Sequence, residues 1–66
     1  MKIKINGAEK ELDQQLSLKT LLSQLDNLPL YFVLALNYNC IPSDDYSFIQ
    51  LKEGDEIEIV SPMQGG

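Results

Sequence analysis

The stretch Lys2-Ile3-Lys4-Ile5-Asn6-Gly7 decides how the fold begins, because it joins an alternating polar and apolar run to an Asn-Gly pair. Alternation with a period of two predicts a β-strand. Asn-Gly favours a two-residue hairpin, since both central residues of a type I′ turn adopt positive φ. A second strand is therefore expected from about Ala8 to Asp13, with the weak pattern that suits the edge of a sheet.

The period changes after this hairpin. Four leucines recur at the i, i+3, i+4 and i+7 spacing of one helix face: Leu18, Leu21, Leu22 and Leu25. Ser17 is well placed as the N-cap, and Leu16 and Leu21 are spaced to form a hydrophobic staple. The Asp26 to Pro29 stretch ends the pattern. The segment predicts a short amphipathic helix that needs a sheet to cover.

The second half of the chain predicts further strands. Residues 32–36 are apolar at every position, which indicates an inner strand with both faces or nearly both buried. Residues 37–39 supply turn chemistry, and Cys40-Ile41 predicts a brief extended return that Pro42 ends. Residues 56–60 alternate again, with two isoleucines as the inward pair.

Two polar segments connect these strands. Ser43 resembles a helix cap followed by two acids, Asp44 and Asp45, in a first turn where the helix dipole favours negative charge. One turn of helix is expected there. Residues 51–55 read as a polar turn around Gly54. The predicted order is β-β-α-β, a short strand and turn, then β.

This order predicts an α+β domain, with a mixed sheet of four to five strands and one helix packed on one face. Residues 1–60 form the domain. Residues 61–66 are expected to form a flexible tail ending in Gly-Gly, because Pro62 lacks an N–H and two glycines are costly to order. Hydrophobic residues make up 44% of the 66 and charged residues 23%, which is typical of one globular domain.

Composition excludes several classes of protein. The longest strongly apolar run falls far short of the ~20 residues of a membrane-spanning helix, and no secretory signal is visible, so we expect a cytoplasmic protein. Residues 1–32 carry no net charge and residues 33–66 carry −5. Nucleic acid would repel such a surface, whereas a basic patch on a protein partner complements it.

The chain offers little catalytic chemistry. Cys40 is the only cysteine and histidine is absent, which excludes an internal disulfide and a Cys/His zinc site. Cys40 is expected to be a small packed hydrophobe. Asp44-Asp45, Glu56 and Glu58 are expected to be solvated surface carboxylates. These observations predict a protein that is not an enzyme.

The ending Gly65-Gly66 is the remaining candidate. Chance alone gives this ending in about one chain in 200, and a flexible stub or an engineered scar would produce it as well. A functional interpretation explains more: ATP can activate a terminal carboxylate, and slender glycines allow a narrow channel of another enzyme to admit the tail. Pro62 would stiffen the stem.

Several motifs resemble the ThiS family, the ubiquitin-like sulfur carriers of thiamine thiazole biosynthesis. They are Ile5-Asn6-Gly7, residues 35–42 (Ala-Leu-Asn-Tyr-Asn-Cys-Ile-Pro), residues 54–59 (Gly-Asp-Glu-Ile-Glu-Ile) and Gly65-Gly66. The resemblance covers almost the whole chain. The chain departs from the family at residues 43–45, where a basic residue is common, and at Met63, where a small or β-branched residue is usual.

The resemblance implies a β-grasp fold with the first and last strands side by side. It implies that a ThiF-like enzyme adenylates Gly66 with ATP, and that a cysteine desulfurase or another persulfide donor supplies sulfur for a thiocarboxylate. Thiazole synthase then takes this sulfur. Gly65, Gln64 and Met63 would thread into the partner, and the chain itself would bind no cofactor or metal.

Three alternatives remain open at this point. The small subunit of molybdopterin synthase shares the fold, the Gly-Gly end and the thiocarboxylate, but is usually longer and lacks the signature from Asn37 to Pro42. A ubiquitin-like modifier would be joined through Gly66 to lysine amines. A passive interaction domain would not need Gly66 at all.

Overall fold

The computed structural model describes residues 1–61. In this range the elements are β1 (Lys2–Ile5), β2 (Ala8–Glu11), α1 (Leu18–Ser23), β3 (Val33–Leu36), β4 (Asn39–Cys40), the 3₁₀ helix η1 (Ser43–Phe48) and β5 (Glu56–Val60). The tail predicted for residues 61–66 lies outside the described residues from Pro62 onward.

The opening hairpin forms as predicted. Asn6 and Gly7 have φ values of 50° and 85°, and β1 pairs antiparallel with β2. β2 ends two residues earlier than expected, because Leu12 leaves the strand to become a buried core residue with 5% of its surface exposed. Its N–H donates to the Met1 carbonyl at 2.7 Å, which closes the hairpin against the start of the chain.

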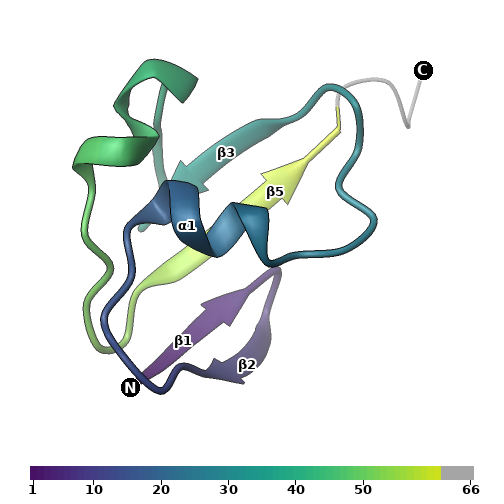
Figure 1. Ribbon diagram of the computed structural model, residues 1–66. Coiled ribbons are helices and arrows are strands. Elements are labelled where there is room, and N and C mark those ends of the chain that lie inside the picture. The colour runs from purple at the N-terminus through teal and green to yellow at the C-terminus, as the bar shows by residue number, and fades with distance from the viewer. Residues whose placement is uncertain (62–66) are drawn as a thin grey trace.

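The sheet has the strand order β2-β1-β5-β3-β4. β1 and β5 are parallel neighbours in its middle, and the other pairs are antiparallel. Figure 1 shows α1 crossing one face of this mixed sheet between the hairpin and β3. The predicted α+β architecture and the β-grasp pairing of first and last strands are therefore confirmed.

Helix α1 begins where the sequence predicts. The Ser17 hydroxyl oxygen accepts a hydrogen bond from the Thr20 N–H at 3.1 Å. The helix ends at Ser23, before the predicted stop at residues 26–29, because its last turn tightens: the Leu25 N–H donates to the Leu22 carbonyl three residues back, at 3.2 Å. Asn27 then reverses the chain with a φ of 64°.

The core lies between the sheet and α1. Nine hydrophobic side chains are buried in it: Ile3, Leu12, Leu16, Leu18, Leu21, Leu22, Leu34, Leu51 and Ile57. Leu25 packs against this cluster although it lies outside the helix. The predicted leucine face is therefore the face that covers the sheet.

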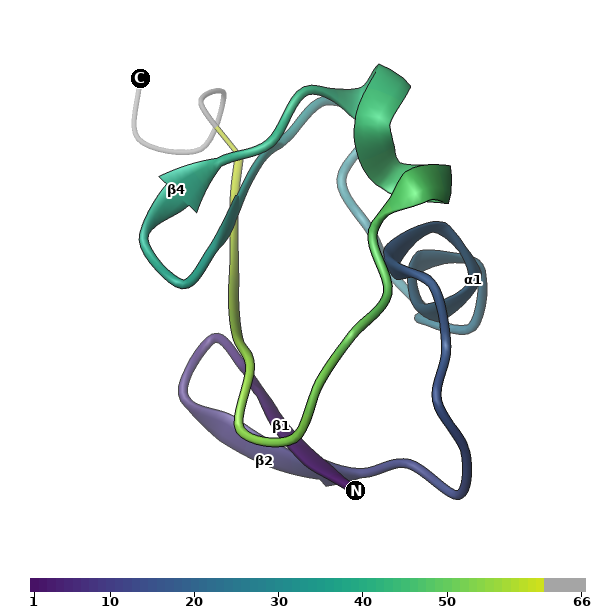
Figure 2. The same ribbon diagram turned by 90° about the vertical axis from the view of Figure 1, so that its left-hand side faces the viewer.

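Strand β3 is an inner strand, as predicted, but only one of its faces is buried. Leu34 is 1% exposed, whereas its neighbour Val33 is 48% exposed. Alternate residues of a strand point to opposite faces, and both helical segments lie on the same side of the sheet (Figure 2). The prediction that nearly both faces are buried is wrong because nothing in the described chain covers the second face. We call this second face the open face.

The segment after β4 is more helical than predicted. η1 spans six residues instead of one turn, and Ser43 is its first residue, whereas Pro42 occupies the N-cap position without a side-chain hydrogen bond. The Asp45 N–H closes the first 3₁₀ turn on the Pro42 carbonyl at 3.0 Å. Asp44 and Asp45 lie in the first turn, as expected.

Candidate functional site at the end of strand β5

The predicted site residues Met63, Gln64, Gly65 and Gly66 lie outside the residues that the structure describes. The described chain reaches Ser61, one residue after β5. The geometry therefore defines the stem from which these residues continue.

β5 is held from both sides in the middle of the sheet. It pairs with β1 in parallel and with β3 in antiparallel register, from Val33↔Val60 to Leu36↔Ile57. Ile57 is 1% exposed and anchors the strand in the core. β1 reaches only Glu56 and Ile57, whereas β3 pairs with β5 as far as Val60, so pairing with β3 sets the position of Val60.

Asn6 fastens the C-terminal half of β5 to the β1–β2 turn. Its Oδ1 accepts a hydrogen bond from the Ile59 N–H at 2.7 Å, and its Nδ2 donates to the Ile59 carbonyl at 3.3 Å. β1 has ended at Ile5, so an asparagine side chain replaces the next backbone partner. Asparagine suits this place because it tolerates positive φ and carries both a donor and an acceptor.

Asn37 fastens the opposite end of β5. Its Oδ1 accepts from the Glu56 N–H and its Nδ2 donates to Asp55 Oδ1, both at 3.0 Å. Asp55 Oδ2 accepts from the Lys52 N–H at 2.8 Å. Asp55 is only 8% exposed, although its segment was predicted as a polar turn. We call the hydrogen-bonded pair Asn37 and Asp55 the clasp. It connects two of the motifs that the sequence analysis identified, the one that contains Asn37 and the one that begins with Gly54-Asp55.

A pocket of about 320 Å³ lies beside the end of β5. Nine residues from the β1–β2 turn, the α1–β3 loop and the strand end line it: Ile5, Asn6, Leu25, Asp26, Asn27, Leu28, Pro29, Ile59 and Ser61. We call it the tail-base pocket. Figure 1 shows the α1–β3 loop running next to the end of β5. Its lining mixes apolar and polar side chains, and Asp26 is the single charged residue among the described residues that line it.

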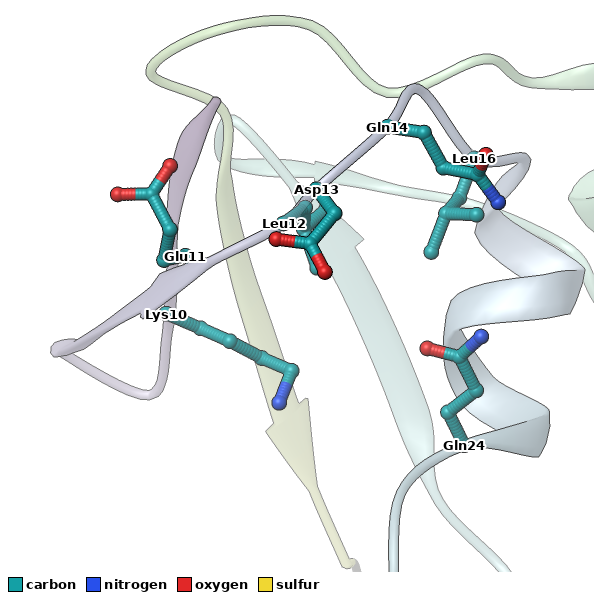
Figure 3. Close-up of a pocket in the computed structure, with 7 residues that line it drawn as sticks. All are labelled: Lys10, Glu11, Leu12, Asp13, Gln14, Leu16 and Gln24. Carbon is teal, nitrogen blue, oxygen red and sulfur yellow. The ribbon is translucent and has the colours of Figure 1, made fainter.

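A second depression, of about 390 Å³, lies between β2 and α1 and is drawn in Figure 3. Leu12 and Leu16, which line it, are core residues, and Lys10 and Gln24 face one another across it. The Glu11 carboxylate points away from the gap and pairs with the Met1 ammonium at 3.1 Å. These side chains form no nucleophile and base pair, so this depression offers no catalytic chemistry.

Cys40 is not the packed hydrophobe that the sequence predicts. It is exposed in β4, the short edge strand, opposite Ala35. Ala35 alternates with the buried Leu34 and therefore belongs to the open face. Cys40 shares that face, which explains its exposure.

The remaining polar candidates stay apart. Asp44 and Asp45 are exposed in η1, Glu58 is exposed on β5 and Glu56 is half-buried. In residues 1–61 no three Cys, Asp or Glu side chains gather to hold a metal ion. Burial raises the pKa of the Tyr46 phenol above its usual value, so this group stays neutral at pH 7.

Sequence reasoning missed the roles of two side chains in this arrangement, Asn6 and Asp55. Asn6 was interpreted only as a turn residue, and Asp55 only as part of a polar loop. A usable signal exists for each. An asparagine at positive φ next to a central strand has spare hydrogen-bonding groups, and an aspartate directly after a turn glycine, Gly54 with φ 85°, can accept from the turn's own N–H groups.

In residues 1–61 no helix has the length and apolar character that crossing a membrane requires. The ThiS family model matches residues 3–66. The chain is 29% identical over 66 residues to a thiazole synthase of Paramagnetospirillum magneticum, and it spans only 20% of that relative's length.

Two solved structures of one bacterial protein resemble this fold. Both represent the thiamine biosynthesis protein (ThiS) of Geobacter metallireducens, which is 28% identical to this chain. Its crystal structure matches with a TM-score of 0.85 over all of both chains. Its solution structure matches with a TM-score of 0.75 over all of this chain and 88% of that one.

Proposed function

Because the chain belongs to the ThiS family, we propose that it is a sulfur carrier of thiamine biosynthesis whose Gly66 carboxylate becomes a thiocarboxylate. The observation that carries this proposal is the family match, which extends through Gly65-Gly66, on a fold that superimposes over its full length on a ThiS protein.

The proposed reaction has two steps. A Gly66 carboxylate oxygen attacks the α-phosphorus of ATP and pyrophosphate leaves, which produces an acyl-adenylate. A sulfur nucleophile then attacks the acyl carbon, and AMP leaves with the original carboxylate oxygen. Sulfide yields the thiocarboxylate directly, whereas a persulfide yields an acyl disulfide that a thiol must reduce.

Other proteins supply the catalysis in this proposal. A ThiF-like enzyme binds ATP and adenylates the chain, and a cysteine desulfurase or another persulfide donor provides sulfur. Thiazole synthase accepts the sulfur, which the similarity to a segment of a much longer thiazole synthase supports. The chain is then a co-substrate that binds no cofactor of its own and works in the cytoplasm.

The geometry of β5 supports a role in which this chain presents its C-terminal residues to a partner enzyme. Both ends of the strand are fastened by asparagine side chains, so the fold presents the stem in one direction. We propose that Met63, Gln64 and Gly65 enter a narrow channel of the partner and place Gly66 at its nucleotide. A stem fixed beforehand lowers the entropy lost on insertion.

Reconstitution tests this function. The chain is incubated with its adenylating enzyme, ATP and sulfide, and its intact mass is measured. Exchange of one oxygen for sulfur is expected, and a matched variant that lacks Gly66 should stay unmodified if its denaturation midpoint is unchanged.

Three results would overturn the proposal. An unchanged mass with an active adenylating enzyme would exclude the carrier. A ladder of lysine adducts would favour the ubiquitin-like modifier. Exchange with delivery to molybdopterin precursor instead of thiazole precursor would favour the molybdopterin synthase relative.

A further inference from the structure

Asn6 and Gly7, the two residues of the β1–β2 turn, are open to solvent. Both are exposed, and their φ values of 50° and 85° shape the turn. A Cβ atom built on Gly7 would meet no atom within 4 Å beyond the two neighbouring residues of the chain. The turn therefore leaves room around the peptide bond that joins Asn6 to Gly7.

An asparagine followed by glycine can react with its own backbone. The glycine nitrogen attacks the side-chain carbon Cγ, a bond forms between them, and the side-chain nitrogen leaves as ammonia with the proton of the glycine N–H. Glycine has no side chain to hinder this approach. Water then opens the resulting succinimide at one of its two carbonyls. One opening gives aspartate, and the other gives isoaspartate, whose backbone runs through the former side chain.

The sequence concentrates this reactivity at one position. The chain has four asparagines, Asn6, Asn27, Asn37 and Asn39. The last three are followed by leucine, tyrosine and cysteine, whose side chains crowd the attacking nitrogen. Asn6 alone precedes a glycine.

The fold restrains the group that would react. Asn6 Oδ1 accepts a hydrogen bond from the Ile59 N–H at 2.7 Å, and Asn6 Nδ2 donates to the Ile59 carbonyl at 3.3 Å. These two bonds hold the amide toward β5. Attack requires Cγ to turn toward the Gly7 nitrogen in an aligned geometry, so the bonds to Ile59 must open first.

We propose that Asn6 is a deamidation site, that its hydrogen bonds to Ile59 control the reaction, and that the isoaspartate product detaches the C-terminal half of β5 from the first turn. The reaction consumes only water and is not reversed by refolding. The inference concerns the chemistry of this chain itself and is independent of the proposed sulfur-carrier function.

The detachment follows from the way β1 and β5 pair. Their register covers only Glu56 and Ile57 of β5, and the side chain of Asn6 continues the contact to Ile59. Isoaspartate adds a methylene to the turn backbone and replaces the amide by a carboxylate on a shorter arm. Aspartate keeps an acceptor for the Ile59 N–H, but it places a second oxygen where Nδ2 donated to the Ile59 carbonyl. Isoaspartate therefore disturbs this end of β5 more than aspartate does.

Peptide mapping tests the site and its control. The purified chain is incubated at mildly alkaline pH, once folded and once in guanidinium chloride, and the mass at each asparagine is followed over time. In denaturant Asn6 should convert first, with a gain equal to the difference between an OH and an NH2 group. In the folded chain Asn6 should convert about tenfold more slowly or less, because the reaction waits for local opening.

Gly7→Asn is the matched variant. Asparagine tolerates positive φ, and its side chain has free space at this position. The substitution keeps the turn but crowds the attacking nitrogen, so it should slow conversion of Asn6 in denaturant severalfold. An unchanged denaturation midpoint establishes that the variant is folded.

Hydrogen exchange tests the consequence for β5. The isoaspartate form is separated and refolded, and its amide exchange is measured by NMR. The Ile59 N–H should exchange about tenfold faster or more than in the unmodified chain. The Leu51 N–H, which donates to the Leu16 carbonyl at 2.9 Å on another side of the core, is the internal control and should keep its protection.

Three outcomes would overturn the inference. Conversion of another asparagine before Asn6 in denaturant would place the site elsewhere. Conversion of Asn6 in the folded chain at the rate of the denatured chain, or faster, would show that the bonds to Ile59 do not restrain it. Full protection of the Ile59 N–H in the isoaspartate form would show that β5 does not depend on Asn6 for its position.

Discussion

Asn6 and Asn37 play the same role at the two ends of β5: the side chain of each forms hydrogen bonds that hold the strand in place. Both have φ near 50°, and both direct an amide side chain to backbone groups at the margin of the strand. Each combines a turn and a clamp in one residue, which glycine, lacking a side chain, cannot do. Asn27 has a similar φ of 64°, and no side-chain hydrogen bond is observed for it in residues 1–61.

This difference predicts the cost of removing the clasp. Asn37→Gly keeps the backbone conformation but leaves the buried Asp55 carboxylate without one of its donors, so unfolding free energy should fall by about 1–3 kcal/mol. Asn27→Gly, the matched control, should change it by no more than about 0.5 kcal/mol. Urea denaturation measures both. Equal effects of the two substitutions would refute a stabilising role for the clasp.

Tyr38 is strained at the surface. Its φ is 71° and its side chain is 84% exposed, so little packing offsets a conformation that bulky residues disfavour. Tyr38→Asn should raise the unfolding free energy by about 0.5–1 kcal/mol, because asparagine tolerates this region better. A lower midpoint in thermal or urea denaturation would show that the Tyr38 ring makes stabilising contacts.

Helix α1 depends on burial rather than on its own length. Six residues are too few for an isolated helix in water, so the leucine face must hold it on the sheet. Leu22→Ala should cost about 2–5 kcal/mol, since Leu22 is 8% exposed within the core. Leu30→Ala, at 88% exposure, should cost less than about 0.5 kcal/mol. Similar midpoints for the two variants would refute the orientation of the helix.

Local patterns predicted the elements that local physics determines. The Asn6-Gly7 turn, the Ser17 cap and the alternation in β5 each depend on a few neighbouring residues, and all three are observed. The errors concern tertiary context. The open face beside Val33 and the full length of η1 depend on which segments pack together, and no local pattern encodes this.

In the candidate site, too, some features can be predicted from local sequence and others depend on the tertiary fold. Gly65-Gly66 can be recognised in the sequence because its chemistry lies in the residue types. The tail-base pocket could not be predicted, because it joins the first turn, a central loop and the last strand, which only the fold brings together. Asp55 shows the same limit, since its burial follows from a partner 18 residues away.

In the complete fold, the sheet and helices position the strand β5, after which the chain continues toward the proposed reactive residue Gly66. The mixed sheet holds β5 in its centre, the helices cover one face, and exposed apolar side chains lie near the end of β5, the strand that leads toward Gly66. Lys2 and Lys4 lie on β1, directly beside β5, and Lys10 lies on the edge strand β2.

The proposed sulfur chemistry is tested by the intact mass of this chain purified from its own cells grown without thiamine. We predict a species heavier than the unmodified chain by the difference between one sulfur and one oxygen atom, with fragment ions that place the gain on Gly66. Only unmodified chain in such cells would contradict the account. Addition of a whole sulfur atom to the exposed Cys40 would contradict it as well, because the carrier group would then be a thiol and not the terminal carboxylate.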